Sequence, residues 1–193
     1  MLIPGKPVKT GRYANPLLTP QQERERLRYL ARQAEQALMG VQMASMDELT
    51  LLSNRHGFIA LAQLGLDACE QLDTPATLLY FTLDEFKHII YLYGRHEGDD
   101  VLKTFADVLR IGFRENDVVG RIQGGRFAVL LTGSSAVEIA AIKMRIDEIL
   151  AERNATARRS YDIRFSVGQV EYDPTLYGSV EDLLSEAERV MGL

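Results

Sequence analysis

Apolar residues recur along the chain at two spacings, one helical and one typical of buried strands. Between Asp99 and Phe113 they return every three or four residues, which predicts an amphipathic helix. Residues 76–83 are apolar on both faces, which predicts a buried strand. The same criteria predict a helix to about Leu72, a short helix after residue 84, helices over 136–153 and 180–191, and a strand over 163–171.

The stretch 121–131 reads Arg-Ile-Gln-Gly-Gly-Arg-Phe-Ala-Val-Leu-Leu. Glycine accepts the positive φ of a tight turn and the apolar flanks suit a sheet, so we predict a β-hairpin with Gly124 and Gly125 at its tip. The phosphates of a ligand can approach bare backbone closely at such a tip. Helices that alternate with strands around one antiparallel hairpin predict an α/β sandwich, with a central mostly antiparallel sheet flanked by helices.

The first part of the chain differs from the rest. Residues 1–18 are rich in proline and glycine and carry basic but no acidic residues, which predicts a flexible arm. Thr19-Pro20-Gln21-Gln22 predicts a helix start with a capping box, and the helix is expected to run to about Ser45. The predicted organisation is an arm over 1–18, a signalling or coiled-coil helix over 19–46, and one domain over 47–193.

The apolar heptad positions of this helix leave two interpretations open. Either the helix forms a short two-stranded coiled coil, or it packs against its own domain. The second interpretation stays open because alanine at these positions would bury little area in a coiled coil. The positions are Leu27, Leu30, Ala34, Ala37, Val41 and Ala44.

Composition narrows the classes of function. The 193 residues carry a net charge of −5 and are 46% apolar, as expected for one domain with an appendage. A nucleic-acid partner is not expected, because neutralising its phosphates needs a basic excess. The single Cys69 cannot form an intrachain disulfide and is expected to be a buried helix residue. No apolar run approaches the roughly 18 residues of a membrane span, so we expect a cytoplasmic chain without a membrane segment.

Two segments carry a family resemblance. The hairpin resembles that of the GGDEF family, the diguanylate cyclases, whose tip reads Gly-Gly-Asp/Glu-Glu-Phe after Arg-Leu or Arg-Ile. Residues 47–55, Asp-Glu-Leu-Thr-Leu-Leu-Ser-Asn-Arg, are similar to the family's opening motif Asp-x-Leu-Thr-Gly-Leu-Pro-Asn-Arg. The resemblance implies a nucleotide-cyclase palm-like sandwich over 47–193, preceded by the N-terminal helix.

The resemblance also implies which residues matter for chemistry. The family holds Mg²⁺ with the first Asp of Asp-x-Asp-x-Phe-Lys and with an acid at the hairpin tip; the matching positions here are Thr82, Gly125 and Arg126. Aligning Gly124-Gly125 with the family's glycine pair instead still leaves no acid at the tip. Ile90 stands where the family reads guanine with Asn. We therefore expect degenerate catalytic positions, no metal or other cofactor, and a chain that is not an enzyme.

Other family positions are retained. Arg114 and Asp117 form an Arg-x-x-Asp at the distance from the hairpin where the family places its inhibitory cyclic di-GMP site, and Arg145 matches a second arginine of that site. Arginine can bond guanine O6 and N7, and aspartate can accept from its N–H groups. The alternative is structural: Arg114 caps the preceding helix and Asp117 closes the turn. Asp99 matches a guanine-reading acid or is simply a carboxylate at a helix start.

The sequence thus predicts a catalytically inactive GGDEF-like signalling domain that is a receptor for cyclic di-GMP. A second hypothesis is a protein–protein interaction module with no nucleotide ligand, and a third is residual diguanylate cyclase activity. The expected partners are cyclic di-GMP and either another signalling protein or a second copy of the chain.

Overall fold

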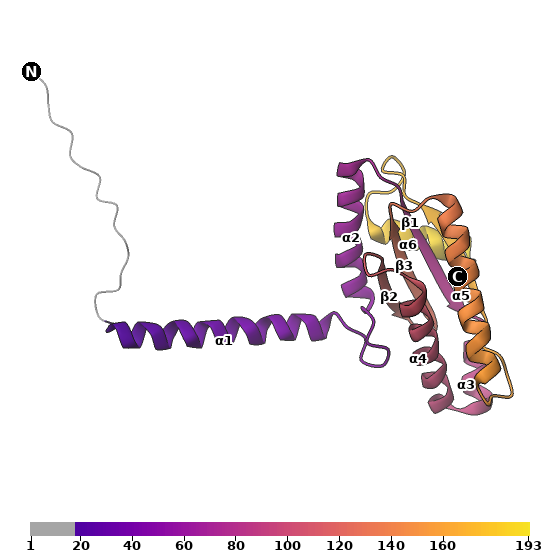
Figure 1. The fold of residues 1–193 in the computed structure, drawn as a ribbon, viewed down its shortest axis with the longest axis horizontal. Helices are drawn as coiled ribbons and strands as arrows, with labels where there is room; N and C mark the ends of the chain where they lie inside the picture. Colours follow the sequence, from indigo (N-terminus) through magenta and orange to yellow (C-terminus); the bar gives the residue numbers. More distant parts are fainter. Residues whose placement is uncertain (1–17) are drawn as a thin grey trace, which may run out of the picture. The chain divides into compact units, whose positions relative to one another are not determined.

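The computed structural model describes residues 18–193 of the chain (Figure 1). The arm predicted over 1–18 lies almost wholly outside the described residues. The chain divides into two compact units, residues 1–42 and 43–193.

The described part of the first unit is residues 18 and 19 followed by helix α1, Pro20–Ala44, whose last two residues belong to the second unit. It begins as the sequence predicts: the backbone N–H of Thr19 donates to Gln22 Oε1 at 2.9 Å, and the N–H of Gln22 donates to Thr19 Oγ1 at 3.3 Å. This reciprocal capping box satisfies two N–H groups that the first turn leaves unpaired. Leu27 and Leu30, in the apolar stripe of α1, are 61% and 51% exposed.

The second unit is an α/β sandwich around a four-stranded sheet of order β2-β3-β1-β4 (Figure 1). Every pair of neighbouring strands is antiparallel, as predicted. The elements are α2 (Arg55–Leu72), β1 (Ala76–Leu83), α3 (Phe86–Tyr93), α4 (Arg95–Gly112), β2 (Val118–Gln123), β3 (Arg126–Thr132), α5 (Ala136–Thr156), β4 (Phe165–Glu171) and α6 (Val180–Val190).

Helices cover both faces of this sheet. Helices α4 and α5 pack on the face that carries Phe81 and Phe127, whereas α2 and α6 pack on the face that carries Tyr80 and Leu130. Strand β1 lies between β3 and β4, and only Thr82 of its residues is not buried. Side chains of neighbouring strand residues point to opposite faces, so the unbroken apolar run of β1 follows from having a core on each side. Cys69 is buried in α2, as predicted.

Several element boundaries differ from the predictions; helix α5, for example, ends at Thr156 instead of about Arg153. Helix α4 begins at Arg95, so Asp99 lies beyond its first turn instead of at its start. Strand β4 begins at Phe165 instead of Ile163, because the Asn154 side chain bonds both the N–H and the C=O of Ile163 at 2.9 Å. Ile163 is buried, and both of its backbone groups bond the Asn154 side chain instead of a neighbouring strand.

Candidate functional site

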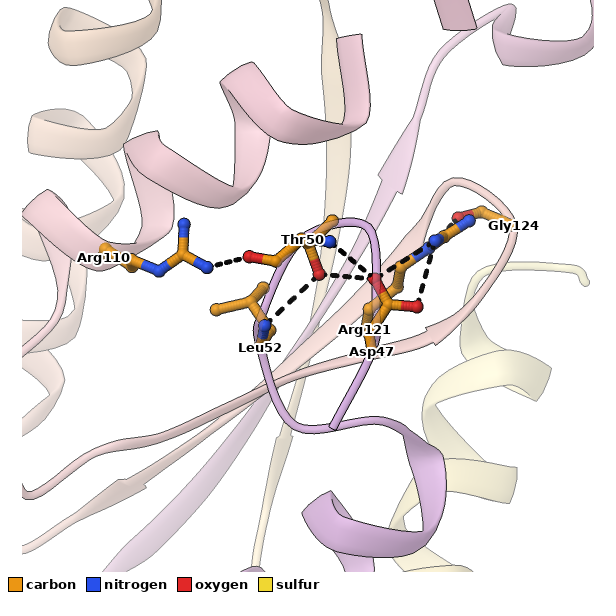
Figure 2. Close-up of polar contacts among 6 residues, drawn as sticks. All are labelled: Asp47, Thr50, Leu52, Arg110, Arg121 and Gly124. Atoms are coloured by element: carbon orange, nitrogen blue, oxygen red, sulfur yellow. Dashed lines mark hydrogen bonds and ion pairs between the residues drawn. The ribbon is translucent and has the colours of Figure 1, made fainter. Parts of the chain in front are cut away.

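The hairpin tip is tied to the turn that follows α1 (Figure 2). Arg121 Nη1 lies 3.1 and 3.2 Å from the two carboxylate oxygens of Asp47, and Arg121 Nε donates to the Gly124 carbonyl at 2.9 Å. The side chains of Asp47 and Arg121 are only 20% and 17% exposed. A single guanidinium therefore holds both the turn and the tip, with charge-assisted bonds that are among the stronger ones in proteins.

Thr50 completes the network from the other side. Its N–H and hydroxyl donate to Asp47 Oδ2 at 2.9 and 2.6 Å, and Arg110 of α4 donates to its carbonyl (Figure 2). Partial burial raises the pKa of Asp47, but the bonds from Thr50 and the charge of Arg121 outweigh it and hold the pKa below 3.8. Asp47 is therefore ionised at neutral pH and serves as the anionic centre of the turn.

The tip itself has little room for side chains. Gly124 has a φ of +48°, which only glycine adopts readily, and Gly125 is buried. A Cβ on Gly125 would lie 3.0 Å from the Phe86 ring and 3.3 Å from Leu83 Cβ. The Gly125 carbonyl also accepts from the Leu83 N–H at 2.9 Å, which fixes the tip against the end of β1.

The positions predicted to be degenerate come together at this tip. Thr82 of β1 pairs directly with Arg126 of β3. Both residues line a cavity of about 380 Å³ with Gly125 and with Lys87 and His88 of α3. The family motifs thus identified residues that share one site, although they lie 44 positions apart in the chain.

The predicted nucleotide-reading positions lie on α3 and α4. The side chain of Ile90 packs so closely on Gly98 that a Cβ added there would meet Ile90 Cγ1 at 2.6 Å. Asp99, the next residue, is partly exposed near the start of α4. An apolar side chain therefore lies beside the position where the family resemblance places guanine recognition.

Arg114, Asp117 and Arg145 meet at one corner of the domain, where α4 ends and β2 begins; we call these three residues the Arg114 corner. Asp117 Oδ2 accepts from the Arg114 backbone N–H at 2.9 Å, and the Asp117 N–H donates to the Arg114 carbonyl at 3.0 Å. Arg145 Nη2 of α5 donates to the Gly112 carbonyl at 2.5 Å. Asp117 closes the turn as the structural alternative expects, but it is Arg145 that caps the helix.

The charges at the Arg114 corner leave polar groups available to bind a ligand. The Arg114 side chain is 67% exposed, and the nearest carboxylate oxygen in an ion pair, Glu138 Oε1, lies 4.0 Å from its Nη2. Burial raises the pKa of Asp117 above its ordinary value, and the N–H and charge of Arg114 only partly offset this effect. Glu138 was not singled out from the sequence, although Ser135 and Glu138 form a capping box at the start of α5 that the sequence pattern could have revealed.

Within residues 18–193 no group of three or more His, Cys, Asp or Glu side chains is arranged to hold a metal ion. None of the helices in that range is long and apolar enough to cross a membrane.

Known proteins are similar to this chain in both sequence and fold. The chain is 29% identical over 134 residues to the probable diguanylate cyclase DgcC of Escherichia coli K12, which covers 69% of this chain and 36% of DgcC. It is 28% identical over 149 residues to the diguanylate cyclase DgcS of Shewanella oneidensis, covering 77% of this chain and 48% of DgcS. The chain thus spans about a third to a half of the length of these relatives.

Three solved structures extend the comparison. The coiled coil and GGDEF domain of DgcB from Caulobacter crescentus, in complex with cyclic di-GMP, matches with a TM-score of 0.74 at 23% identity over 88% of this chain and 90% of that one. The GGDEF domain of PA1120 from Pseudomonas aeruginosa matches with 0.66 at 29% identity, over 74% and 84%. The diguanylate cyclase SiaD of Pseudomonas aeruginosa, solved with its activator SiaC, matches with 0.64 at 23% identity, over 88% and 68%.

These comparisons contradict the expectation that the chain is not an enzyme. The relatives are named diguanylate cyclases, and diguanylate cyclases are enzymes. The expectation rested on the side chains at Thr82, Gly125 and Arg126 and on Ile90 at the guanine-reading position. Other carboxylates lie close by: Glu85 lines the same cavity, and Glu85 and Asp84 line an adjacent one of about 460 Å³.

The family model described as the diguanylate cyclase GGDEF domain matches residues 44–192. This range holds the antiparallel sheet, the hairpin and the turn at Asp47, where the motifs that suggested the resemblance lie. The chain belongs to the GGDEF family.

Proposed function

We propose that this GGDEF domain is a receptor for cyclic di-GMP, which it binds at the Arg114 corner. The observation that carries the proposal is the convergence of three polar side chains, two from the turn between α4 and β2 and one from helix α5. Helix α5 brings Arg145 to the carbonyls of Ile111 and Gly112, immediately before Arg114, although these segments lie more than thirty positions apart in the chain.

Arg114 is suited to the guanine base of the ligand. Its guanidinium is largely exposed, and the one ion pair that it makes among residues 18–193, with Glu138, is long at 4.0 Å, so little must be broken before it binds. Arginine presents parallel N–H groups that match O6 and N7 of guanine, and its planar face can stack on the base.

Asp117 and Arg145 complete the recognition. Asp117 uses one carboxylate oxygen for the Arg114 N–H, and its other oxygen has no hydrogen-bond partner among residues 18–193 and can accept from the guanine N–H groups. Arg145 uses only Nη2 for the α4 carbonyls, which leaves further N–H donors for a phosphate of the ligand. Structures of the related DgcB domain in complex with cyclic di-GMP support this choice of ligand.

Calorimetric titration of the whole chain with cyclic di-GMP tests the proposal. We expect binding that Arg114→Ala weakens by at least about tenfold, since one bidentate contact to guanine is worth about 1–3 kcal/mol. Arg158→Ala is a matched control, because Arg158 is also exposed and lies in the connection after α5. No heat at tens of micromolar ligand, or equal affinity of wild type and Arg114→Ala, would count against the receptor function.

A second candidate function is that of a protein–protein interaction module. The apolar stripe of α1 favours it, because Leu27 and Leu30 are exposed in the single chain and suit a second helix of the same kind. The partner is either a second copy of the chain or another signalling protein, to which α1 would pass the ligand-bound state of the domain. SiaD, solved with its activator SiaC, is a related cyclase that has a protein partner.

A further inference from the structure

An acidic residue, Glu138, lies beside the Arg114 corner but has no part in the contacts proposed for the ligand. It belongs to the first turn of α5, and its Oε1 lies 4.0 Å from Arg114 Nη2. The same helix carries Arg145 seven residues later, which is about two turns and therefore the same helix face. Helix α5 thus presents a carboxylate and a guanidinium on the side that meets the corner.

The Glu138 carboxylate is held in place by its own helix. Its Oε2 accepts from the Ser135 backbone N–H at 2.7 Å, and the Glu138 N–H donates to Ser135 Oγ at 3.3 Å. These two bonds form the capping box at the start of α5. Because they do not involve Arg114, the negative charge stays beside the corner whether or not a ligand is bound there.

The carboxylate is ionised at neutral pH, although the cap does not need its charge. The hydrogen bonds with Ser135 lower the pKa of Glu138 below its ordinary value, and the charge of Arg114 adds to this effect. Glutamine serves at the same position of a capping box, since only a hydrogen-bond acceptor is required. The charge of Glu138 is therefore separable from its role in capping the helix.

This charge opposes an anionic ligand. Arg114 and Arg145 carry two positive charges, which Asp117 and Glu138 balance with two negative ones. Cyclic di-GMP contains two phosphodiester groups and is a dianion at neutral pH, so a balanced site attracts it less than the two arginines alone would. Asp117 closes the turn by bonding the Arg114 N–H. Glu138 has no such bond to the corner, and its charge acts there only on Arg114 and on the ligand.

We infer that Glu138 lowers the affinity of the Arg114 corner for cyclic di-GMP, because it pairs with Arg114 in the ligand-free domain and repels the phosphates of the ligand. The inference rests on the proposed receptor function and adds a residue that determines its affinity. Exposed ion pairs are weak, so Glu138 reduces binding without preventing it. The receptor then fills at a higher ligand concentration than two unopposed arginines would need.

Calorimetric titration of the whole chain with cyclic di-GMP compares the wild type with Glu138→Gln. Glutamine keeps the capping box and removes the charge, so we expect this variant to bind about two- to tenfold more tightly, while its unfolding in urea changes little. Glu152→Gln is the matched control, because Glu152 is an exposed acid of the same helix about 21 Å away along its axis. The control should leave the affinity nearly unchanged.

Two further measurements separate an electrostatic effect from a structural one. The gain from Glu138→Gln should shrink at high salt, since salt screens exposed charges. It should also be smaller in an Arg114→Ala background, because part of the gain comes from releasing Arg114. A gain that is independent of salt, or equally large without Arg114, would contradict the mechanism and overturn the inference.

The outcomes distinguish this inference from the receptor function itself. A wild-type chain that binds cyclic di-GMP, with a Glu138→Gln variant that binds equally or more weakly, would overturn the inference and leave the receptor function standing. Equal gains from Glu138→Gln and Glu152→Gln would also overturn it, since net charge alone would then explain the effect. No heat with either the wild type or Glu138→Gln would overturn both.

Discussion

The ion pair between Asp47 and Arg121 should contribute measurably to the stability of the domain. It joins the turn after α1 to the hairpin over a separation of 74 positions, and each side chain is about four-fifths buried. Exposed pairs are worth about 0–1 kcal/mol, whereas breaking a fully buried pair costs about 3–5 kcal/mol. For this intermediate burial we expect a coupling of about 1–2 kcal/mol between the two side chains.

A double-mutant cycle with Asp47→Asn, Arg121→Gln and the double variant measures this coupling. The free energy of unfolding is obtained from urea denaturation followed by circular dichroism, since the chain has no tryptophan. Asp47→Asn keeps the size of the side chain and its bond from the Thr50 N–H, so the cycle reports mainly the charge interaction. Helix propensity plays no part in either substitution, because Asp47 lies in a turn and Arg121 in strand β2.

The pH dependence of this coupling is the most specific test of the prediction. The folded-state pKa of Asp47 is depressed below 3.8, so its contribution is present in full above that value and is lost as the pH falls through the folded-state pKa. The coupling should therefore be equal at neutral and mildly acidic pH and disappear in stronger acid. A coupling near zero at neutral pH, or one that persists unchanged in strong acid, would refute the role assigned to this pair.

Three further predictions concern single positions. Asp117→Asn should weaken cyclic di-GMP binding yet cost little stability at neutral pH. Burial raises the pKa of Asp117, so the stability that its protonated form contributes is already lost once the pH has risen above that pKa. Strong destabilisation of this variant in urea would show a structural role for Asp117 instead. Gly57→Ala should destabilise by about 1–3 kcal/mol because its Cβ would lie 2.2 Å from the Ser45 carbonyl, whereas the control Gly40→Ala, with nothing within 4 Å, should stabilise α1 by about 0.5–1 kcal/mol. Leu30→Glu should convert a dimer into a monomer in analytical ultracentrifugation if α1 forms a coiled coil, and a monomeric wild-type chain would contradict that interaction.

Local sequence signals predicted most of the fold. The tip at Gly124 and Gly125, the buried strand β1 and the capping box at Thr19 depend on neighbouring residues, so the sequence is sufficient for each. The start of β4 was harder to predict from the sequence. It depends on the side chain of Asn154, eleven positions earlier, which bonds both backbone groups of Ile163.

Candidate site residues could be predicted only where a family motif pointed to them. The resemblance led to Thr82 and Arg126, and the sheet register explains why they meet. The pairing of Asp47 with Arg121 and the capping of α4 by Arg145 could not be derived from spacing, because they depend on how separate elements pack. The substitutions at the tip were also an insufficient basis for excluding an enzyme, since a fold can place other carboxylates nearby, as Asp84 and Glu85 are here.

A crystal structure of the chain grown with cyclic di-GMP tests the receptor function most directly. We predict that a guanine base of the ligand contacts the Arg114 guanidinium and the free oxygen of Asp117, with Arg145 still bonded to the end of α4. Ligand bound elsewhere on the domain, or no ligand beside Arg114 at a saturating concentration, would contradict the proposed function.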